Sequence, residues 1–287
     1  MKRKQHHVIF DIMGVFIFGV LLALMGYCSR VHAYDQQKPA DFHLDPLAYE
    51  TFVTVKTIGI ASALYPDLKS GEYRWIEGLC AFDIEGSGTV IASGYVITAA
   101  HVVEPDTVDV RTSMISIFRT RPREVLSRYI LVFDSEGSPV LAQIYMIDTN
   151  RDIAILKLQT NNFLIPFKAG LNPERAQFTV GDVIAMVVHK RDKAGTMTND
   201  LTIVWGKVVA KRAISCRGED KLPWFSMWDF TMKMEMQPGD SGSAIFVFHK
   251  GKPVLIGVGR AAMSNESGDL EYSYAAWAGG LQRYLGK

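Results

Sequence analysis

"GSGTVIASGYVITAAHVV", residues 86–103, places two apolar runs on either side of the tripeptide Ala-Ser-Gly. Val, Ile and Tyr are enriched in strands, and a short connection containing Gly between two such runs is typical of a β-hairpin. The second run ends in two alanines directly before His101. The small side chains leave room for a neighbouring element to pack there. The stretch therefore predicts a hairpin that ends at a histidine.

The same pattern recurs along most of the chain. Short apolar or alternating runs, bounded by Gly, Asp, Asn or Pro, lie at 52–60, 88–100, 107–118, 129–134, 140–148, 153–158, 182–189, 201–214, 230–236, 243–249 and 253–259. Such runs are typical of strands, and long helical periodicity is scarce. The sequence therefore predicts an all-β fold, either a barrel or a sandwich. Only residues 274–287 are expected to form a short C-terminal helix.

The strand-rich part, residues 52–287, divides into two halves. Residues 159–177 carry two prolines and lack alternation, which indicates a connection rather than another strand. We expect a first half over about 52–160, a connection over about 161–177 and a second half over about 178–287.

The composition excludes some classes of function. The 287 residues are 48% hydrophobic and 21% charged, with a formal net charge of +1. These values are typical of a folded globular protein, and they lack the basic excess of a nucleic-acid-binding domain. No Cys or His spacing fits a metal site. Cys80 and Cys216 leave both a disulfide and two free thiols open, and the oligomeric state is not predicted.

The N-terminus has the composition of a targeting segment. A basic start, MKRKQHH, precedes an uncharged run over 12–29, and Val-His-Ala at 31–33 fits the small-residue rule for signal cleavage. Residues 1–33 are therefore predicted to be a signal peptide, or an uncleaved membrane anchor through residues 8–29. Residues 34–51 are expected to be a linker. Either alternative predicts an exported protein, periplasmic or secreted.

A second motif places a serine where a turn meets a strand. In "PGDSGSAIF", residues 238–246, glycines flank Asp240 and Ser241. A serine hydroxyl becomes a nucleophile only with a base and a group that orients the base. His101 is the best base, and Asp152, which directly precedes the apolar run of "RDIAILKL", is the best orienting acid. Asp148 is the nearest alternative to Asp152. The chain order of His, Asp and Ser is that of chymotrypsin-like enzymes.

With these three motifs the chain resembles the trypsin-like (chymotrypsin-fold) serine peptidases. The similarity is greatest to the bacterial branch that includes glutamyl endopeptidases and high-temperature-requirement proteases. The resemblance implies two six-stranded antiparallel β-barrels and a serine endopeptidase. Ser241 would attack the peptide bond, His101 would act as base and Asp152 would orient the histidine. It also implies an oxyanion hole in the backbone of Gly239, Asp240 and Ser241, a protein or peptide substrate, and no metal or organic cofactor.

Substrate preference and regulation stay open at this point. Candidate substrate-binding residues are Glu235, Gly259, Arg260 and Ala261. A pocket-facing Glu235 would favour a basic side chain before the cleaved bond, unless Arg260 neutralises it. Gly259 and Ala261 would favour a small or apolar side chain, and an acidic one is the third alternative. The 46 residues after Ser241 are too few for the PDZ domain of high-temperature-requirement proteases, so none is expected. The chain also lacks an Ile-Val-Gly-Gly activation sequence. The alternatives are therefore a regulated protease and a non-catalytic, protease-like binding module.

Overall fold

The structure is a computed structural model. It describes residues 47–67, 74–105, 107–111, 117–134, 136–160, 178–192, 194, 196–211, 229–249, 252–264, 270–279 and 281. The predicted signal or anchor segment and the predicted connection over 161–177 lie outside this described part. None of the helices within it is long and apolar enough to cross a membrane.

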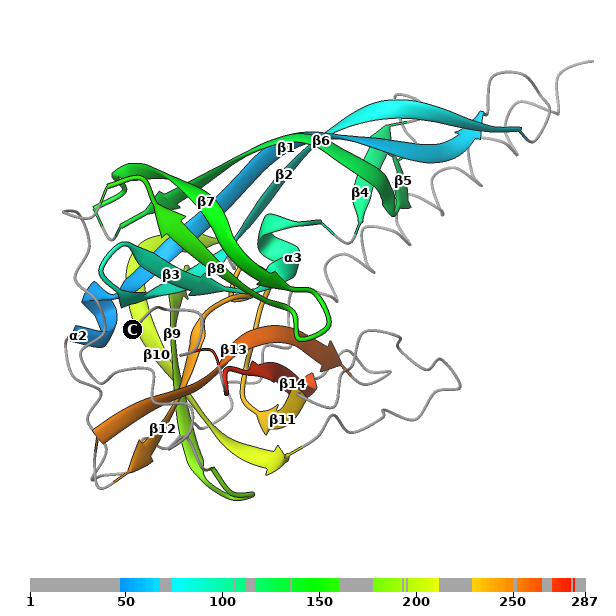
Figure 1. The fold of residues 1–287 in the computed structure, drawn as a ribbon. Helices are drawn as coiled ribbons and strands as arrows, with labels where there is room; N and C mark the ends of the chain where they lie inside the picture. Colours follow the sequence, from blue (N-terminus) through cyan, green and yellow to red (C-terminus); the bar gives the residue numbers. More distant parts are fainter. Residues whose placement is uncertain are drawn as a thin grey trace, which may run out of the picture.

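Two closed antiparallel barrels of six strands each make up the fold, so the all-β prediction is confirmed (Figure 1). In the first barrel the strands follow the order β1-β2-β3-β8-β7-β6. Their bounds are β1 Phe52–Asp67, β2 Arg74–Ala92, β3 Tyr95–Thr98, β6 Pro122–Phe133, β7 Pro139–Asp148 and β8 Ile153–Leu158. Strands β2 and β3 form the hairpin that the opening stretch predicts, paired through Thr89↔Ile97.

The second barrel has the order β10-β11-β14-β13-β12-β9. Its strands are β9 Val183–Arg191, β10 Met197–Ala210, β11 Asp229–Lys233, β12 Ala244–His249, β13 Lys252–Ser264 and β14 Leu270–Trp277. The two short helices, α2 Leu47–Glu50 and α3 Ala100–Val103, belong to the N-terminal part of the described chain. The single strand expected over 107–118 is instead a two-stranded sheet of β4 Val108–Arg111 and β5 Ile117–Thr120.

The C-terminal helix prediction is wrong for its first residues. Tyr274 to Trp277 continue strand β14 and pair with β11 and β13. Tyr274, Ala275 and Ala276 are all fully buried, so the strand is covered on both faces and its sequence shows no alternation. An apolar run of this kind does not distinguish strand from helix by period. Residues 282–287 lie outside the described part.

Alternation along β8 explains how the barrels are held together. Ala154 and Leu156 point into the core of the first barrel. Ile153 and Ile155 point the other way, into a cluster shared with Phe246 and other side chains of the second barrel. All four β8 side chains are fully buried. Burial of this much apolar surface between the barrels favours one rigid arrangement over two independent units.

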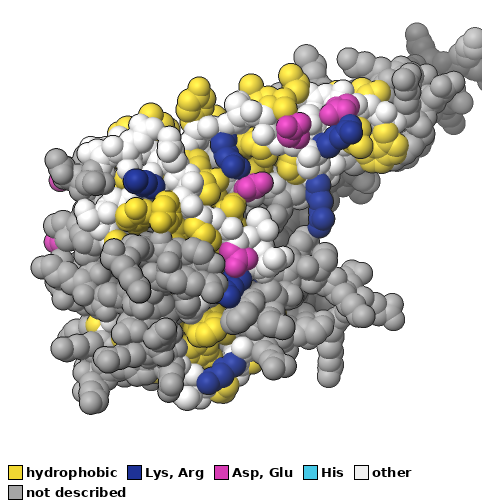
Figure 2. Space-filling view, in the orientation of Figure 1, with side chains coloured by type: hydrophobic (Ala, Val, Ile, Leu, Met, Phe, Trp, Pro, Cys, Tyr) yellow, Lys and Arg dark blue, Asp and Glu magenta, His cyan; other side chains and the backbone are white. Residues whose placement is uncertain are grey.

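Strands β1 and β2 continue beyond the first barrel as a long extension (Figure 1). One face of the extension carries exposed apolar side chains, and Figure 2 shows apolar groups gathered on this part of the surface. The exposed apolar residues of these two strands are Ile58, Ile60, Leu64, Trp75 and Leu79.

Candidate active site

Asp152 and His101 meet at one end of the first barrel. His101 lies in α3, directly after β3, and Asp152 lies in the turn between β7 and β8. The Asp152 carboxylate accepts the His101 backbone N–H at 2.9 Å through Oδ1, and its Oδ2 lies 2.8 Å from His101 Nδ1. A carboxylate only accepts hydrogen bonds, so Nδ1 carries the proton and Nε2 the lone pair in the neutral ring. This tautomer allows Nε2 to act as a base.

The backbone of Asp152 has a left-handed conformation with φ of 56°. Asp is one of the few residues other than Gly that adopt this region at moderate cost. The side chain is almost fully buried. Asp148, the alternative candidate, instead accepts the Arg151 backbone N–H at 3.1 Å and pairs with the Arg151 side chain at 3.3 Å. The turn therefore presents Asp152, and not Asp148, to His101.

Ser241 lies in the loop between β11 and β12, and this loop is attached to the first barrel. Ser87 on β2 donates its backbone N–H to the Ser241 carbonyl at 2.7 Å and its hydroxyl to the Gly239 carbonyl at 2.8 Å. Gly242 has φ of 91°, and a Cβ there would lie 2.0 Å from the Ser87 carbonyl oxygen. Only glycine fits so close an approach in this conformation.

Two backbone amides of the loop differ from their neighbours. Within the described residues, the N–H groups of Gly239 and Ser241 donate to no protein acceptor. The Asp240 amide, by contrast, donates to the Gln237 carbonyl at 3.0 Å. Of the three backbone groups that the sequence analysis names for an oxyanion hole, Gly239 and Ser241 are therefore the two whose N–H groups have no protein acceptor among the described residues.

The Asp240 carboxylate is buried beneath the loop, and its partners come from two elements. Oδ2 accepts the Gln237 backbone N–H at 2.8 Å, and Oδ1 lies 3.6 Å from Arg191 Nη2 on β9. Arg191 also donates to the Pro238 carbonyl. Burial raises the pKa of Asp240 to about 6, although Gln237 and Arg191 both act to lower it. Arg191 is not predicted from the sequence, because nothing in "VVHKR" indicates that this side chain turns toward a loop 49 residues later.

The four candidate substrate-binding residues have different surroundings. Glu235 accepts a hydrogen bond from the Gln237 side chain at 2.8 Å. Gly259 bonds through its backbone to Gly242 and Ser243, both at 2.8 Å. Ala261 lies on β13 opposite Tyr274.

Arg260, the fourth of these residues, points toward the catalytic candidates. Its Nε lies 3.2 Å from Asp152 Oδ2, and its carbonyl lies 3.3 Å from Ser241 Oγ, which donates to it. Neither contact is predicted from the sequence.

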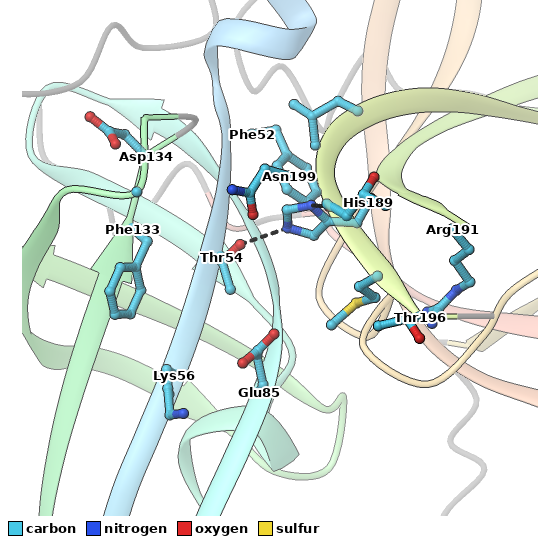
Figure 3. Close-up of a pocket in the computed structure, with 14 residues that line it drawn as sticks. Phe52, Thr54, Lys56, Glu85, Phe133, Asp134, His189, Arg191, Thr196 and Asn199 are labelled. Carbon is cyan, nitrogen blue, oxygen red and sulfur yellow. Dashed lines mark hydrogen bonds between the residues drawn. The ribbon is translucent and has the colours of Figure 1, made fainter. Parts of the chain in front are cut away.

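A cavity of about 600 Å³ lies beside the serine loop, between β1 of the first barrel and β9 and β10 of the second (Figure 3). His189 lines it and links the barrels, with Nε2 2.7 Å from the Thr54 hydroxyl and Nδ1 2.9 Å from the Thr198 carbonyl. Burial lowers the pKa of His189. The structure places His189 half-buried between the two barrels. Two lining residues approach the loop. Arg191 donates to the Pro238 carbonyl, and the Met197 sulfur would lie 2.8 Å from a Cβ added at Gly239.

Two further groups bear on the chemistry of the chain. Cys80 is a buried free thiol that donates to the Ala61 carbonyl, and Cys216 lies outside the described residues. Among the residues that the structure describes, no group of three or more His, Cys, Asp or Glu side chains is placed to hold a metal ion.

A model of the trypsin-like peptidase domain matches residues 86–258, which is more than half of the chain. The chain belongs to the trypsin-like peptidase family. It is thus a serine-type endopeptidase, a hydrolase that acts on peptides or proteins. The matched segment contains His101, Asp152 and Ser241.

Solved structures share the fold of this trypsin-like peptidase. The active form of the Rv3671c protease from M. tuberculosis matches at 17% identity with a TM-score of 0.50, over 84% of this chain and 82% of that one. The HtrA-type protease AlgW with a decapeptide matches at 18% identity and a TM-score of 0.50, over 82% of this chain and 61% of that one. No curated protein matches this chain.

Proposed function

We propose that this peptidase cleaves peptide bonds through a triad of Ser241, His101 and Asp152 and a covalent acyl-enzyme. The observation that carries the proposal is the double contact of Asp152 with His101, through the backbone N–H and through Nδ1. One carboxylate thereby fixes both the position of the histidine and its tautomer. Ser241 is attached to the same barrel through Ser87, which supports a fixed distance between the nucleophile and the base.

In this mechanism the Ser241 hydroxyl attacks the carbonyl carbon, and His101 Nε2 takes its proton. The C–N bond then breaks as His101 gives the proton to the departing amine, which leaves an ester on Ser241. Water attacks the ester in the same way and releases the acid. Asp152 stabilises the imidazolium in both halves of the reaction. These roles follow the general description of such triads.

The developing oxyanion needs hydrogen-bond donors that are not already bonded to another protein group. The amides of Gly239 and Ser241 meet this condition within the described residues, so we assign the oxyanion hole to them. Removing one such donor typically costs about 10²–10³-fold in rate. Arg191 takes up the buried charge of Asp240 and a carbonyl of the same loop. This contact supports a loop that is ordered without an inserted N-terminal amine.

We also propose that the cavity near Gly239 forms part of the substrate-binding cleft. Pockets with a few charged groups on a partly apolar wall commonly bind ligands. Its wall carries cations from Lys56 and Arg191 and an anion from Glu85. We therefore expect the cavity to bind polar side chains of the substrate. Export of the protein remains a prediction from residues 1–33.

A fluorophosphonate probe tests the triad directly, because it reacts only with an activated serine. We expect the fragment 34–287 to be labelled and its Ser241→Ala variant to remain unlabelled, as read by gel fluorescence and intact mass. Peptide libraries would then give the preferred residue before the cleaved bond. A folded wild-type fragment that resists labelling would overturn the triad proposal. It would favour a regulated enzyme or a binding module.

A further inference from the structure

Arg260 contacts the Asp152 carboxylate, although a Ser-His-Asp triad does not need a cation there. Its side chain is only 9% exposed, and its Nε lies 3.2 Å from Asp152 Oδ2. The same oxygen lies 2.8 Å from His101 Nδ1. One carboxylate oxygen therefore serves both an imidazole and a permanently charged guanidinium. Buried arginines of this kind are held by specific partners, because desolvating an unpaired charge is costly.

Arg260 also joins the two barrels at the site. It lies on β13 of the second barrel, and Asp152 lies in a turn of the first. Its carbonyl accepts the Ser241 hydroxyl at 3.3 Å. A single residue thus contacts the acid through its side chain and the nucleophile through its backbone. A displaced Arg260 would alter both.

The charge of Arg260 changes the electrostatic surroundings of the His101 ring. Without it, an imidazolium would lie beside a lone buried carboxylate, which strongly favours the protonated ring. With it, the carboxylate is already balanced by a cation that does not titrate. The neutral ring, which is the form able to act as a base, is then retained to lower pH.

Other charges near the site come from several neighbouring elements. Glu235 accepts a hydrogen bond from the neutral Gln237 side chain, and the other charged groups form three ion pairs. Arg151 pairs with Asp148 in the β7–β8 turn. Arg128 on β6 pairs with Glu104 at the end of α3. In the serine loop, Asp240 pairs with Arg191 of β9. Arg260 is distinguished from these cations by its contact with Asp152.

We propose that Arg260 is a positioning residue that holds the Asp152 carboxylate against His101 and extends activity to lower pH by balancing its charge. The inference rests on the proposed triad. It assigns the Arg260 side chain to the Asp152 carboxylate rather than to the substrate.

The first test follows the His101 ring by NMR as a function of pH in the Ser241→Ala variant, so that it does not depend on activity. We expect Arg260→Gln to raise the titration midpoint by about one pH unit, since a charge at this range is only partly screened. Arg260→Lys, which keeps the charge, should leave the midpoint close to that of the parent. The matched control is Arg123→Gln, which removes a charge 65% exposed on the surface that pairs with Glu77.

In the active enzyme, Arg260→Gln should move the acid limb of the kcat/KM profile upward by the same amount. If the titration midpoint of His101 in Arg260→Gln equals that in the Arg123→Gln control, the proposal is overturned. The triad itself would still stand if the wild type is labelled by fluorophosphonate, so the two failures are distinguishable.

A second test covers the case in which the Gln variant does not fold. Arg260→Lys keeps the charge but loses the Nε–H donor, so kcat/KM should fall by about tenfold, the size of a lost charged hydrogen bond. This loss should vanish in an Asp152→Asn background, because Arg260 acts through that carboxylate. Equal losses in both backgrounds would contradict the proposal.

Discussion

At the scale of single residues, the candidate site depends on side chains and backbone angles that few residue types provide. Asp152 combines a left-handed backbone with a carboxylate that His101 contacts twice. Gly242 allows the serine loop to touch the strand that carries Ser87. Each feature can be changed by itself, and this permits two predictions.

Asp152→Asn should lower kcat by about 10³–10⁴-fold while leaving the fold intact, in line with such substitutions in other triads. Asn tolerates the left-handed backbone as well as Asp does, so the loss reports the charge and the tautomer of His101. Steady-state kinetics and thermal unfolding would check this prediction. The same substitution at Asp148 is the control, and an equal loss there would contradict the assignment of the acid.

Gly242→Ala should destabilise the protein by more than about 3 kcal/mol, because its Cβ would overlap the Ser87 carbonyl in addition to being strained. Gly137→Ala is the matched control. Gly137 has φ of 80° but nothing within 4 Å of the added Cβ, so its cost should be about 1 kcal/mol from strain alone. Urea unfolding of both variants measures the difference. Equal costs would mean that the close contact of the loop with β2 contributes nothing.

At the scale of elements, β9 carries side chains that contact both the serine loop and the first barrel. Arg191 at its C-terminal end contacts Asp240 and Pro238, and His189 two residues earlier contacts Thr54 of the first barrel. The strand thereby connects the loop, the cavity and both barrels. The buried carboxyl of Asp240 makes this connection sensitive to pH.

Stability should depend on the ionisation of Asp240. Its pKa is about 6 in the folded chain against an ordinary value of 3.8. The folded state therefore binds this proton more tightly, and ionisation opposes folding. The free energy of unfolding should fall by about 3 kcal/mol from this group as the pH rises from about 4 to about 6.

Asp240→Asn removes that titration, so the variant should gain about 3 kcal/mol relative to the wild type across the same window. Urea unfolding at several pH values measures the gain. Asp83→Asn is the control, because it removes an exposed carboxylate that pairs with Lys56. A constant difference between Asp240→Asn and the wild type from pH 4 to 7 would contradict the prediction.

At the scale of the whole molecule, the barrels share one apolar cluster and one site. Ile155 of β8 is fully buried in that cluster. Ile155→Ala should cost about 2–5 kcal/mol, because it leaves a cavity between the barrels. The two barrels should still unfold in a single transition.

Ile60→Ala is the control for this prediction, since Ile60 lies on the same barrel but is 44% exposed. Its cost should be below about 1 kcal/mol. Denaturation followed by circular dichroism and by Trp fluorescence would report both the cost and the number of transitions. Two separated transitions would show that the shared cluster does not couple the barrels.

The motifs by themselves determined the strand-rich fold, the family and the candidates for nucleophile, base and acid. They could do so because turn chemistry, alternation and the order of His, Asp and Ser are local or one-dimensional signals. The hairpin over residues 86–103 is the clearest case. The C-terminal strand was missed because residues buried on both faces lose their alternation.

Only the tertiary structure decided which charges meet. Arg191 reaches Asp240, and Arg260 reaches Asp152, across 49 and 108 residues of sequence respectively. Likewise the cavity and the half-buried His189 exist only where two barrels pack together. Long side chains such as Arg carry no local signal of direction. Their partners are set by barrel closure and strand register, which arise from contacts between residues distant in the chain.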